Sequence, residues 1–345
     1  MAVDETSNDL DENPNNNLGN NLGKDASNTT VKDTAPNQNQ KSALVWLGVL
    51  LVIALGIYFQ NPAYALLGAL ALRLILDVNP IKQSGTIGKL SLQTAIVLLG
   101  FSLGIDSLMQ MSSDYGLIVA VFVLGTLGLG LLMGRLLRSD QVETTLIASG
   151  TAICGRTAIA TLAPLINAKP QQFAVATALV FLLNIIALLT FPYIGTQLGL
   201  SQEVFGAWVA LAIHDTSSVM ATATIYGDEA AQVAAAVKLG RTLWLIPLAF
   251  AVSLIYGRRE AKIRVPTFVL LFVGMAIVSR FVPLEPVVVG YISLLSKTLL
   301  VIALAMIGLE INRQTLSQMS MRSIGLGVGL WIIVEPVALA LVLYL

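Results

Sequence analysis

The residues best suited to chemistry lie in 208–226, where an apolar run meets the only histidine of the 345-residue chain. His214 is followed directly by Asp215, Thr216, Ser217 and Ser218. Because histidine titrates near neutral pH, a His–Asp pair beside hydroxyls could couple the movement of a ligand to protons or cations. An ionisable group at membrane depth costs about 2.5 to 3.5 kcal/mol and by default marks a pathway or a bound ligand. The alternative is a His–Asp pair that holds a helix interface closed.

A second polar stretch, 152–161, is similar in sequence to the first. It reads AICGRTAIAT, against AIHDTSSVMAT at 212–222, and contains Cys154, Gly155, Arg156 and Thr157. Glycine and hydroxyl residues weaken a helix here, and the N-terminus of a half-helix that points into the membrane favours an anion. Arg156 adds a permanent charge that can bind an oxyanion through two hydrogen bonds. For any single hydroxyl, a role in helix packing is the stronger expectation.

Two further cations, Lys238 and Arg241, lie three residues apart and therefore on one face of the helix expected at 230–257. They are some distance inside that segment, which favours a role in lining a pathway over snorkelling to the surface. Asn184, Lys297 and Glu335 are weaker candidates. His214 and Asp215 are predicted to gate or couple transport, and the predicted substrate site comprises Cys154, Gly155, Arg156, Thr157, Thr216, Ser217, Ser218, Lys238 and Arg241.

Composition predicts an all-α polytopic membrane protein around these residues. Hydrophobic residues make up 56% of the chain and charged residues 12%, whereas about a quarter of a soluble domain is charged. The balance of 20 basic and 20 acidic residues suggests no nucleic-acid partner, and a single cysteine excludes an intramolecular disulfide. A membrane span takes about 20 residues, which predicts about eleven segments: 43–59, 63–76, 88–105, 116–137, 144–166, 171–194, 204–226, 230–257, 265–281, 287–309 and 323–345.

The ends and loops of the chain predict its topology. Residues 1–41 are polar and lack large apolar side chains, which predicts a disordered tail before a transmembrane domain at 42–345. Lys and Arg gather in every second loop, including the basic cluster at 258–264, which places the N-terminus in the cytoplasm. Lys169 and Arg280 are the exceptions. If the fifth and seventh segments were both re-entrant hairpins, Lys169 would move to the cytoplasmic side.

An internal repeat is also predicted. Residues 90–108 resemble 294–316, with Gly104 aligned on Gly308 and Asp106 on Glu310, 204 residues apart. The first four segments then correspond to the last four, and an odd number of segments separates the copies. They would therefore lie inverted in the membrane, which is typical of secondary transporters with broken helices at the substrate site. The polar stretches at 152–161 and 212–222 are the two predicted breaks.

Several short motifs identify a resemblance that covers about 43–345. They are Ile153-Cys154-Gly155, Ile213-His214-Asp215, Lys238 to Arg241, and 305–309, which reads AMIGL. In this order and spacing they resemble the sulfate exporter (PSE) family of bacterial inner-membrane proteins. The resemblance implies a secondary carrier of ten or eleven helices that exports a small anion, and Cys154, Gly155, His214, Asp215, Lys238 and Arg241 as shared positions. The chain departs from the family at Gln93, Ser102 and Arg156, so its positive charge is differently placed.

The leading interpretation is therefore a secondary active transporter of a small anion, such as sulfate or a related organic anion, working by alternating access. The alternative is an anion channel or a non-transporting sensor whose polar breaks are structural. Enzyme motifs are missing: there is no H-E-x-x-H, no phosphate-binding G-x-x-x-x-G-K-[ST], and no second histidine for a metal site. No cofactor is expected. The expected partners are the anion and membrane lipid, with further copies of the chain left open.

Overall fold

The computed structural model describes residues 38–77, 79, 81–256, 267–282, 284–310 and 319–344. Every regular element in these ranges is a helix, which confirms the all-α prediction. The expected tail overlaps the first helix at 38–41, and its other residues, like the cluster at 258–264, lie outside the described residues. The helices are α1 (Gln38–Tyr58), α2 (Pro62–Leu76), α3 (Ser84–Leu103), α4 (Ile105–Leu136), α5 (Gln141–Ala152), α6 (Arg156–Leu162), α7 (Pro170–Gln197), α8 (Gln202–Ala212), α9 (Thr216–Tyr226), α10 (Asp228–Leu243), α11 (Leu245–Ile255), α12 (Thr267–Phe281), α13 (Pro286–Gly308) and α15 (Met321–Tyr344).

Six helices are long and apolar enough to cross a membrane, counting α10 and α11 as one span. Three shorter apolar helices correspond to the first, second and ninth predicted segments. The outer helices expose large apolar side chains, such as Leu47 on α1 and Leu117 on α4, as lipid-facing helices do. The α10–α11 span is the most buried of the six, at 61%. The number of actual crossings stays a prediction, because the fifth and seventh segments are broken.

The fifth predicted segment is a hairpin that returns to the side from which it started. Asp140 caps the start of α5, accepting a hydrogen bond from the Glu143 backbone. The same carboxylate accepts one from Gln172 Nε2 at 2.9 Å, at the start of α7. Had α6 continued in the direction of α5, their 19 residues would have separated these two points by roughly 28 Å. We call α5 and α6 the first hairpin, and its tip is 153–155.

The seventh predicted segment is built in the same way. Tyr226, at the end of α9, donates a hydrogen bond from its hydroxyl to the Leu200 carbonyl oxygen (2.6 Å), just before α8. Its ring stacks on Phe205 of α8 with the centroids 3.7 Å apart. Gln202 Oε1 accepts bonds from the backbone N–H groups that open α10. The chain thus enters and leaves on one side, and we call α8 and α9 the second hairpin, with its tip at 213–215.

The helix ends divide into two faces. On one face, the start of α3 meets the end of α13 where Ser84 donates to Glu310 Oε1 (2.5 Å), and the start of α15 meets α5 where Ser323 donates to Glu143 (2.5 Å). We call this the basic face, because its helix ends and loops carry Arg73, Lys82, Arg135, Arg138, Lys169 and Arg322. We call the opposite one the acidic face, since it carries Asp106, Asp114, Glu203, Asp228, Glu229 and Glu285.

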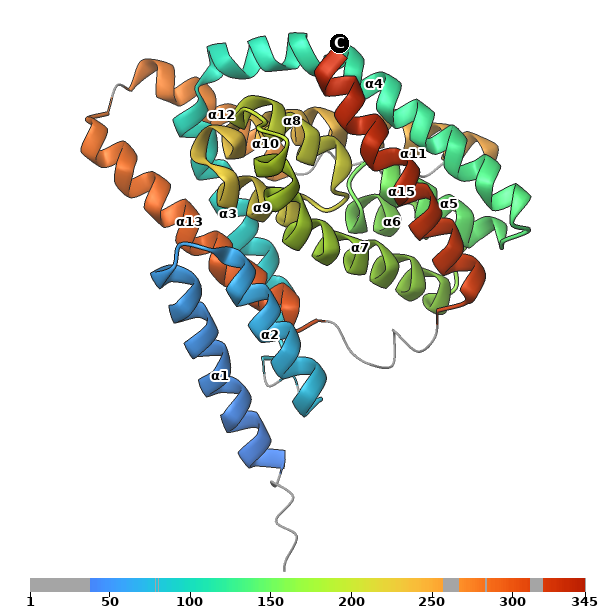
Figure 1. Cartoon of the computed structure of the whole chain (residues 1–345), viewed down its shortest axis with the longest axis horizontal. Helices are drawn as coiled ribbons and strands as arrows, with labels where there is room; N and C mark the ends of the chain where they lie inside the picture. Colours follow the sequence, from blue (N-terminus) through green and yellow to red (C-terminus); the bar gives the residue numbers. More distant parts are fainter. Residues whose placement is uncertain are drawn as a thin grey trace, which may run out of the picture. The chain divides into compact units, whose positions relative to one another are not determined.

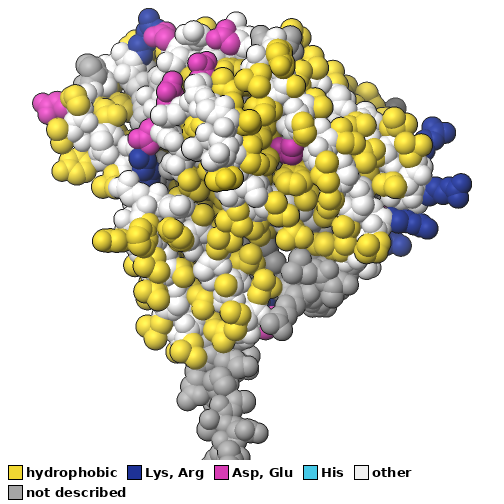
Figure 2. All heavy atoms as spheres, in the orientation of Figure 1, with side chains coloured by type: hydrophobic (Ala, Val, Ile, Leu, Met, Phe, Trp, Pro, Cys, Tyr) yellow, Lys and Arg dark blue, Asp and Glu magenta, His cyan; other side chains and the backbone are white. Residues whose placement is uncertain are grey.

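The two faces differ in the sign of their excess charge, although the basic face also carries Asp77, Asp140, Glu143 and Glu310. Figure 2 shows a group of Lys and Arg side chains at one edge, near the start of α15, and most of the visible Asp and Glu side chains toward the opposite edge. The described cations near the acidic face, Arg280 and Lys297, are paired with Asp106 and Asp228. Because the first hairpin returns to its starting side, Lys169 joins the other basic loops. The loop charges therefore agree better with two hairpins than with two full crossings.

The hairpins lie in the middle of the bundle. Helix α10 packs against α8 and α9 and also against α3 and α4 (Figure 1). On one side α3 packs on α13, with α2 against α13 and α12 against α3; on the other α4, α5, α7 and α15 complete the bundle. The polar tips are consequently enclosed by protein, which is the condition under which irregular backbone is tolerated at membrane depth.

Candidate functional site at the hairpin tips

The tips of the two hairpins touch each other. Gly155 has a φ of +52°, in the left-handed region that favours glycine. A Cβ at this position would lie 3.3 Å from both the Asp215 nitrogen and the His214 carbonyl carbon. Both the close approach and the backbone angle therefore favour a residue without a side chain. The tight turn in the first tip therefore brings the second tip into direct contact.

The helices that lead into the tips, α5 and α8, both end on the buried side chain of Arg241, and Lys238 adds bonds to the second hairpin alone. Arg241 Nε donates to the Ala152 carbonyl oxygen (2.7 Å), and its guanidinium also bonds the carbonyls of Thr151, Ala210 and Leu211. Lys238 Nζ donates to the Ile213 carbonyl oxygen at 2.6 Å. The last carbonyls of a helix lack internal donors and carry its negative dipole end. The two cations supply both the missing hydrogen-bond donors and a positive charge beside the negative end of the dipole.

These cations are fully enclosed. Lys238 and Arg241 both have 0% exposed surface, and the Arg241 guanidinium lies 4.9 Å from the centre of the Phe122 ring. Sequence analysis expected them to line a pathway, and the structure places them elsewhere, behind the tips and outside the lining of the cavity described below. Their donors are already committed to backbone carbonyls. Arg241 joins the inward ends of the two hairpins, and we call this connection the latch.

His214 is held by Asn184 of α7. The His214 backbone N–H donates to Asn184 Oδ1 (3.0 Å), and the ring Nδ1 lies 3.1 Å from the same oxygen. Since Asn184 Oδ1 can only accept, Nδ1 is the protonated nitrogen in this arrangement. His214 is fully buried and does not line the cavity. The side chain that the sequence singled out as a gate thus lies behind the second tip.

The helices that lead out of the tips, α6 and α9, begin beside a cavity of about 360 Å³. Asp215 caps α9, accepting a 3.0 Å bond from the Ser217 backbone N–H and another from the Ser217 hydroxyl. The cavity extends between α3, α6, α7 and the start of α9 on the basic-face side of the tips, and we call it the basic-face cavity. Its polar and charged lining is Lys89, Gln93, Arg156, Thr157, Thr161, Thr177, Asn184, Asp215, Thr216 and Ser217.

Two groups in this lining have unused hydrogen-bonding capacity. Asn184 is 1% exposed, and its Nδ2 has no partner among the described residues because Oδ1 alone serves His214. Thr177 Oγ1 likewise has none among them. Lys89 and Arg156 are exposed to the cavity, and neither forms an ion pair or hydrogen bond with another described residue. A buried polar group without a partner is costly, so this cavity is suited to a polar ligand.

Comparison with known proteins gives the family of the chain. Residues 44–327 match the family described as Conserved hypothetical protein 698. The chain belongs to this family. Its relatives include UPF0324 membrane proteins of Photobacterium profundum (43% identical over 250 residues, 72% of this chain and 76% of that protein) and Porphyromonas gingivalis (37% over 288 residues, 82% and 87%). A third, from Shewanella oneidensis, is 41% identical over 254 residues, 73% of this chain and 80% of that protein. No solved structure matches.

The family result supports the recognised resemblance at a coarser level. The relatives are named as membrane proteins, which agrees with the apolar helices described above. Neither the Conserved hypothetical protein 698 description nor the UPF0324 names give a substrate or a reaction. Membership of this family of membrane proteins is thus shown, while transport, sulfate and the inner membrane stay predictions.

The predicted site residues separate into two groups. Those that line the basic-face cavity are Arg156, Thr157, Asp215, Thr216 and Ser217. Those behind it are Cys154, Gly155, His214, Ser218, Lys238 and Arg241, all of them buried. Cys154 and Gly155 form the first tip, and Ser218 accepts a bond at its carbonyl from the Thr222 hydroxyl (2.7 Å). The sequence predicted breaks in these two segments, but it did not distinguish the residues on the two sides of the tips.

Helix α3 contributes residues to the cavity that were not predicted as a group. Gly85, Lys89 and Gln93 line the cavity and follow one another at intervals of four residues. This spacing places them on one face of a helix, a polar stripe on an otherwise apolar segment. Lys89 was not among the predicted site residues. This polar stripe could have been used to predict that one face of the helix lines a cavity.

Proposed function

We propose that this protein is a secondary active transporter of a small anion, sulfate or a related organic anion, which binds in the basic-face cavity. The observation that carries the proposal is a cavity at two touching hairpin tips whose lining includes Lys89, Arg156 and the Asn184 amide nitrogen, which has no partner among the described residues. Arginine and lysine are the side chains that bind oxyanions, and arginine can do so with two parallel bonds.

The charge of the lining supports an anion over a cation. Two cationic side chains face a single carboxylate, Asp215, which is already bonded to the start of α9 through Ser217. A water molecule takes about 30 Å³ of liquid volume, so a cavity of about 360 Å³ holds a small oxyanion together with part of its hydration shell. The site is therefore matched to a small polar anion.

The hairpins support transport over static binding. Polar backbone is placed at membrane depth only where it is enclosed by protein or lines a water-filled cavity. Broken helices at the substrate site are typical of secondary transporters, in which one bundle rocks against another. Here Arg241 bonds both hairpins, so we expect the two tips to move as one unit. The α3–α13 pair on the other side of the cavity is the natural partner for that motion.

The location of Asp215 supports a division of the coupling role. Asp215 lines the cavity, so a proton or coupling cation that enters with the anion reaches its carboxylate. His214 is behind the tip and holds it to α7 through Asn184. We therefore assign coupling to Asp215 and positioning to His214.

The loop charges support an orientation. Cytoplasmic loops carry the excess of Lys and Arg, so the basic face is proposed to lie in the cytoplasm of a bacterial inner membrane, with the N-terminus on that side. The cavity then opens toward the cytoplasm, where an exporter collects its substrate. Transport outward, by alternating access, is the direction that we propose for this orientation.

Two measurements on the purified full-length protein test the proposal. In detergent, sulfate, phosphate and acetate are compared at equal ionic strength, and at least one is expected to raise the midpoint of thermal unfolding, because ligand binding to the native state stabilises it. In proteoliposomes the same anion should show saturable flux. Flux that does not saturate would indicate a channel, stabilisation without flux a sensor, and neither effect with any anion would refute the proposal.

A further inference from the structure

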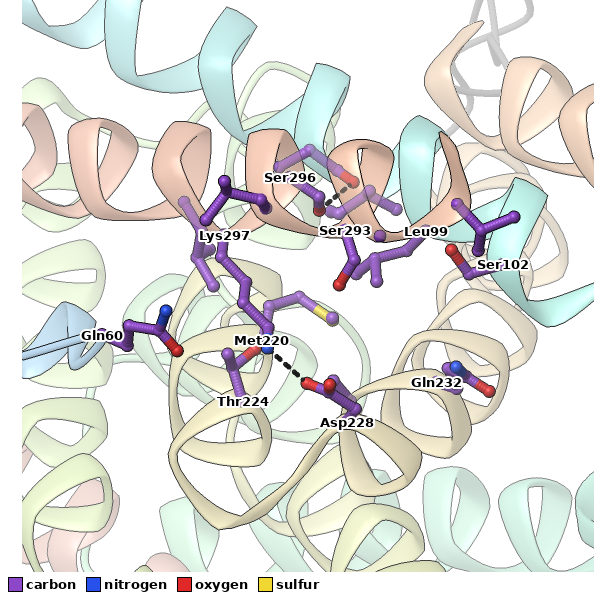
Figure 3. A pocket seen from close by; sticks show the side chains of 17 residues that line it. Gln60, Leu99, Ser102, Met220, Thr224, Asp228, Gln232, Ser293, Ser296 and Lys297 are labelled. Atoms are coloured by element: carbon purple, nitrogen blue, oxygen red, sulfur yellow. Dashed lines mark hydrogen bonds and ion pairs between the residues drawn. The ribbon is translucent and has the colours of Figure 1, made fainter. Parts of the chain in front are cut away.

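A second cavity, of about 470 Å³, lies on the other side of the tips (Figure 3). It opens toward the acidic face between α3, α9, α10 and α13, and we call it the acidic-face cavity. Figure 3 shows Lys297 reaching from α13 to Asp228, with Thr224 and Met220 beside the pair and Gln60 and Gln232 on either side. Lys297 Nζ lies 2.8 Å from Asp228 Oδ1.

The two cavities are lined by equivalent positions of the predicted repeat. The residues on α3 that line the basic-face cavity include Gly85, Lys89, Leu92, Gln93 and Ile96. The offset of 204 residues that aligns Gly104 with Gly308 places these five, in order, on Val289, Ser293, Ser296, Lys297 and Leu300, all of which line the acidic-face cavity. Equivalent surfaces of α3 and α13 therefore line the two cavities, one toward each face.

Packing around these two helices follows the same relation. Helices α3 and α13 cross antiparallel: Gly88 lies against Ala303, whereas Ser296 donates a hydrogen bond to the Ala95 carbonyl oxygen (2.8 Å). Each of these two helices also packs closely against a shorter helix. A Cβ on Gly308 of α13 would lie 2.7 Å from a backbone oxygen of α2, and one on Gly100 of α3 would lie 2.5 Å from a backbone oxygen of α12. The offset does not align Gly100 with Gly308, so the likeness lies in the helix pairs, α2 with α13 and α12 with α3.

Only a thin barrier separates the cavities. Ile96 lines both and is 1% exposed. On α9, Ser217 lines one cavity and Met220 the other. These residues are three apart, a rise of about 4.5 Å along a helix. A small shift of α3 and α13 against the hairpins would therefore be enough to exchange access between the faces.

We propose that the acidic-face cavity is a second binding site for the same anion, with Lys297 as its cation and Ile96 and Met220 as the barrier between the two sites. This inference rests on the proposed function. Lys297 is paired with Asp228, and the side chains of the pair are 30% and 64% exposed. Ion pairs this exposed contribute little to stability, so an incoming anion can replace the carboxylate on Lys297.

Sided labelling of single cysteines tests this site. Cys154 is buried and stays in place, with the chain lacking an engineered cysteine as the background control. Ser293→Cys reports on the acidic-face cavity and Thr161→Cys on the basic-face cavity. A membrane-impermeant maleimide is applied to each side of oriented proteoliposomes. The probe anion is whichever of sulfate, phosphate and acetate supports saturable flux.

Each variant is expected to react from its own face only, and the probe anion is expected to slow labelling of both at least threefold. Protection of T161C without protection of S293C would overturn the second site and leave the proposed function intact. Absence of saturable flux with all three anions would refute the proposed function itself, which keeps the two failures distinguishable.

A charge variant provides an independent measurement. Lys297→Gln places at this position the residue that α3 carries at Gln93. The half-saturating anion concentration is expected to rise about tenfold or more when the anion is supplied at the acidic face, and to change less than twofold at the basic face. Lys82→Gln, a basic-face residue outside both cavities, is the control. An equal change from both faces, or none from either, would contradict the role of Lys297.

Discussion

The two hairpins are alike where their helices lead in and differ where they lead out. The entering helices, α5 and α8, both end on the buried side chain of Arg241. At the exits, Arg156 opens α6 and extends into the basic-face cavity without a described partner, whereas Asp215 opens α9 and is bonded to Ser217. The second tip is also bonded to α7 through Asn184.

This difference between the two ends of the hairpins shows which charged side chains are available to bind a ligand. The cations at the inward ends are saturated by carbonyl oxygens and stabilise the fold. Arg156 at the outward end is unpaired among the described residues, so its binding capacity is free. Stability and ligand binding should therefore respond to different cations, and the variants below test that separation in order of decreasing effect on the fold.

The largest effect is expected for Arg241→Ala. The change leaves the carbonyls of Thr151, Ala152 and Leu211 buried without a donor, and each unsatisfied group costs about 1 to 3 kcal/mol. We expect a loss of more than about 4 kcal/mol, a large part of a typical stability of about 5 to 15 kcal/mol. Thermal unfolding and yield in detergent measure it, and Arg241→Lys should be intermediate.

Lys82→Gln is the control, because Lys82 is exposed on the basic face and lines neither cavity. It should unfold like the original chain. If Arg241→Ala unfolded at the same temperature as this control but lost flux, Arg241 would belong to the ligand site and the division drawn above would be wrong.

The next effect is expected for Gly155→Ala, which tests contact between the tips. The new Cβ must fit 3.3 Å from the Asp215 nitrogen at a φ of +52°, so we expect a cost of about 1 to 3 kcal/mol and weaker anion stabilisation. Gly128→Ala is the matched control, since no atom lies within 4 Å of its added Cβ. Equal unfolding temperatures for the two variants would mean that the tips do not need this contact.

A smaller effect is expected where the second tip is bonded to α7. His214→Ala and Asn184→Ala each remove the same ring contact, and Asn184→Ala also removes the acceptor of the His214 backbone N–H. We expect about 1 to 2 kcal/mol for each, and a double variant that loses less than the sum. Strict additivity in thermal unfolding would show that the two side chains act separately.

Much of this fold could be predicted from the sequence, because membrane helices are recognised by their length and hydropathy. The breaks at 153–155 and 213–215 were also predictable, since glycine, hydroxyl and charged residues interrupt otherwise apolar runs there. Whether the broken segments cross or return was not, because hydropathy does not record direction. The decision depends on single long-range bonds, such as that between Gln172 and Asp140.

The division of the site was less predictable. Arg156 and Arg241 look equivalent in sequence, as arginines inside apolar segments. Their roles differ because Arg241 faces the ends of two helices and Arg156 stands at the start of one. Such a distinction requires knowledge of how α10 packs against the tips. Lys89 was misjudged for a related reason: its helix continues into the cavity lining, so a residue near a loop faces the ligand side.

The smallest effect on stability, and the most specific effect on function, is expected for Arg156→Gln. Because Arg156 is exposed and unpaired among the described residues, unfolding without anion should shift by less than about 0.5 kcal/mol. Stabilisation by the probe anion should largely disappear, and Arg156→Lys should restore part of it, since lysine keeps the charge but loses the paired donors. Unchanged anion stabilisation in Arg156→Gln would place the ligand elsewhere, and a large loss of stability would make the two hairpins alike after all.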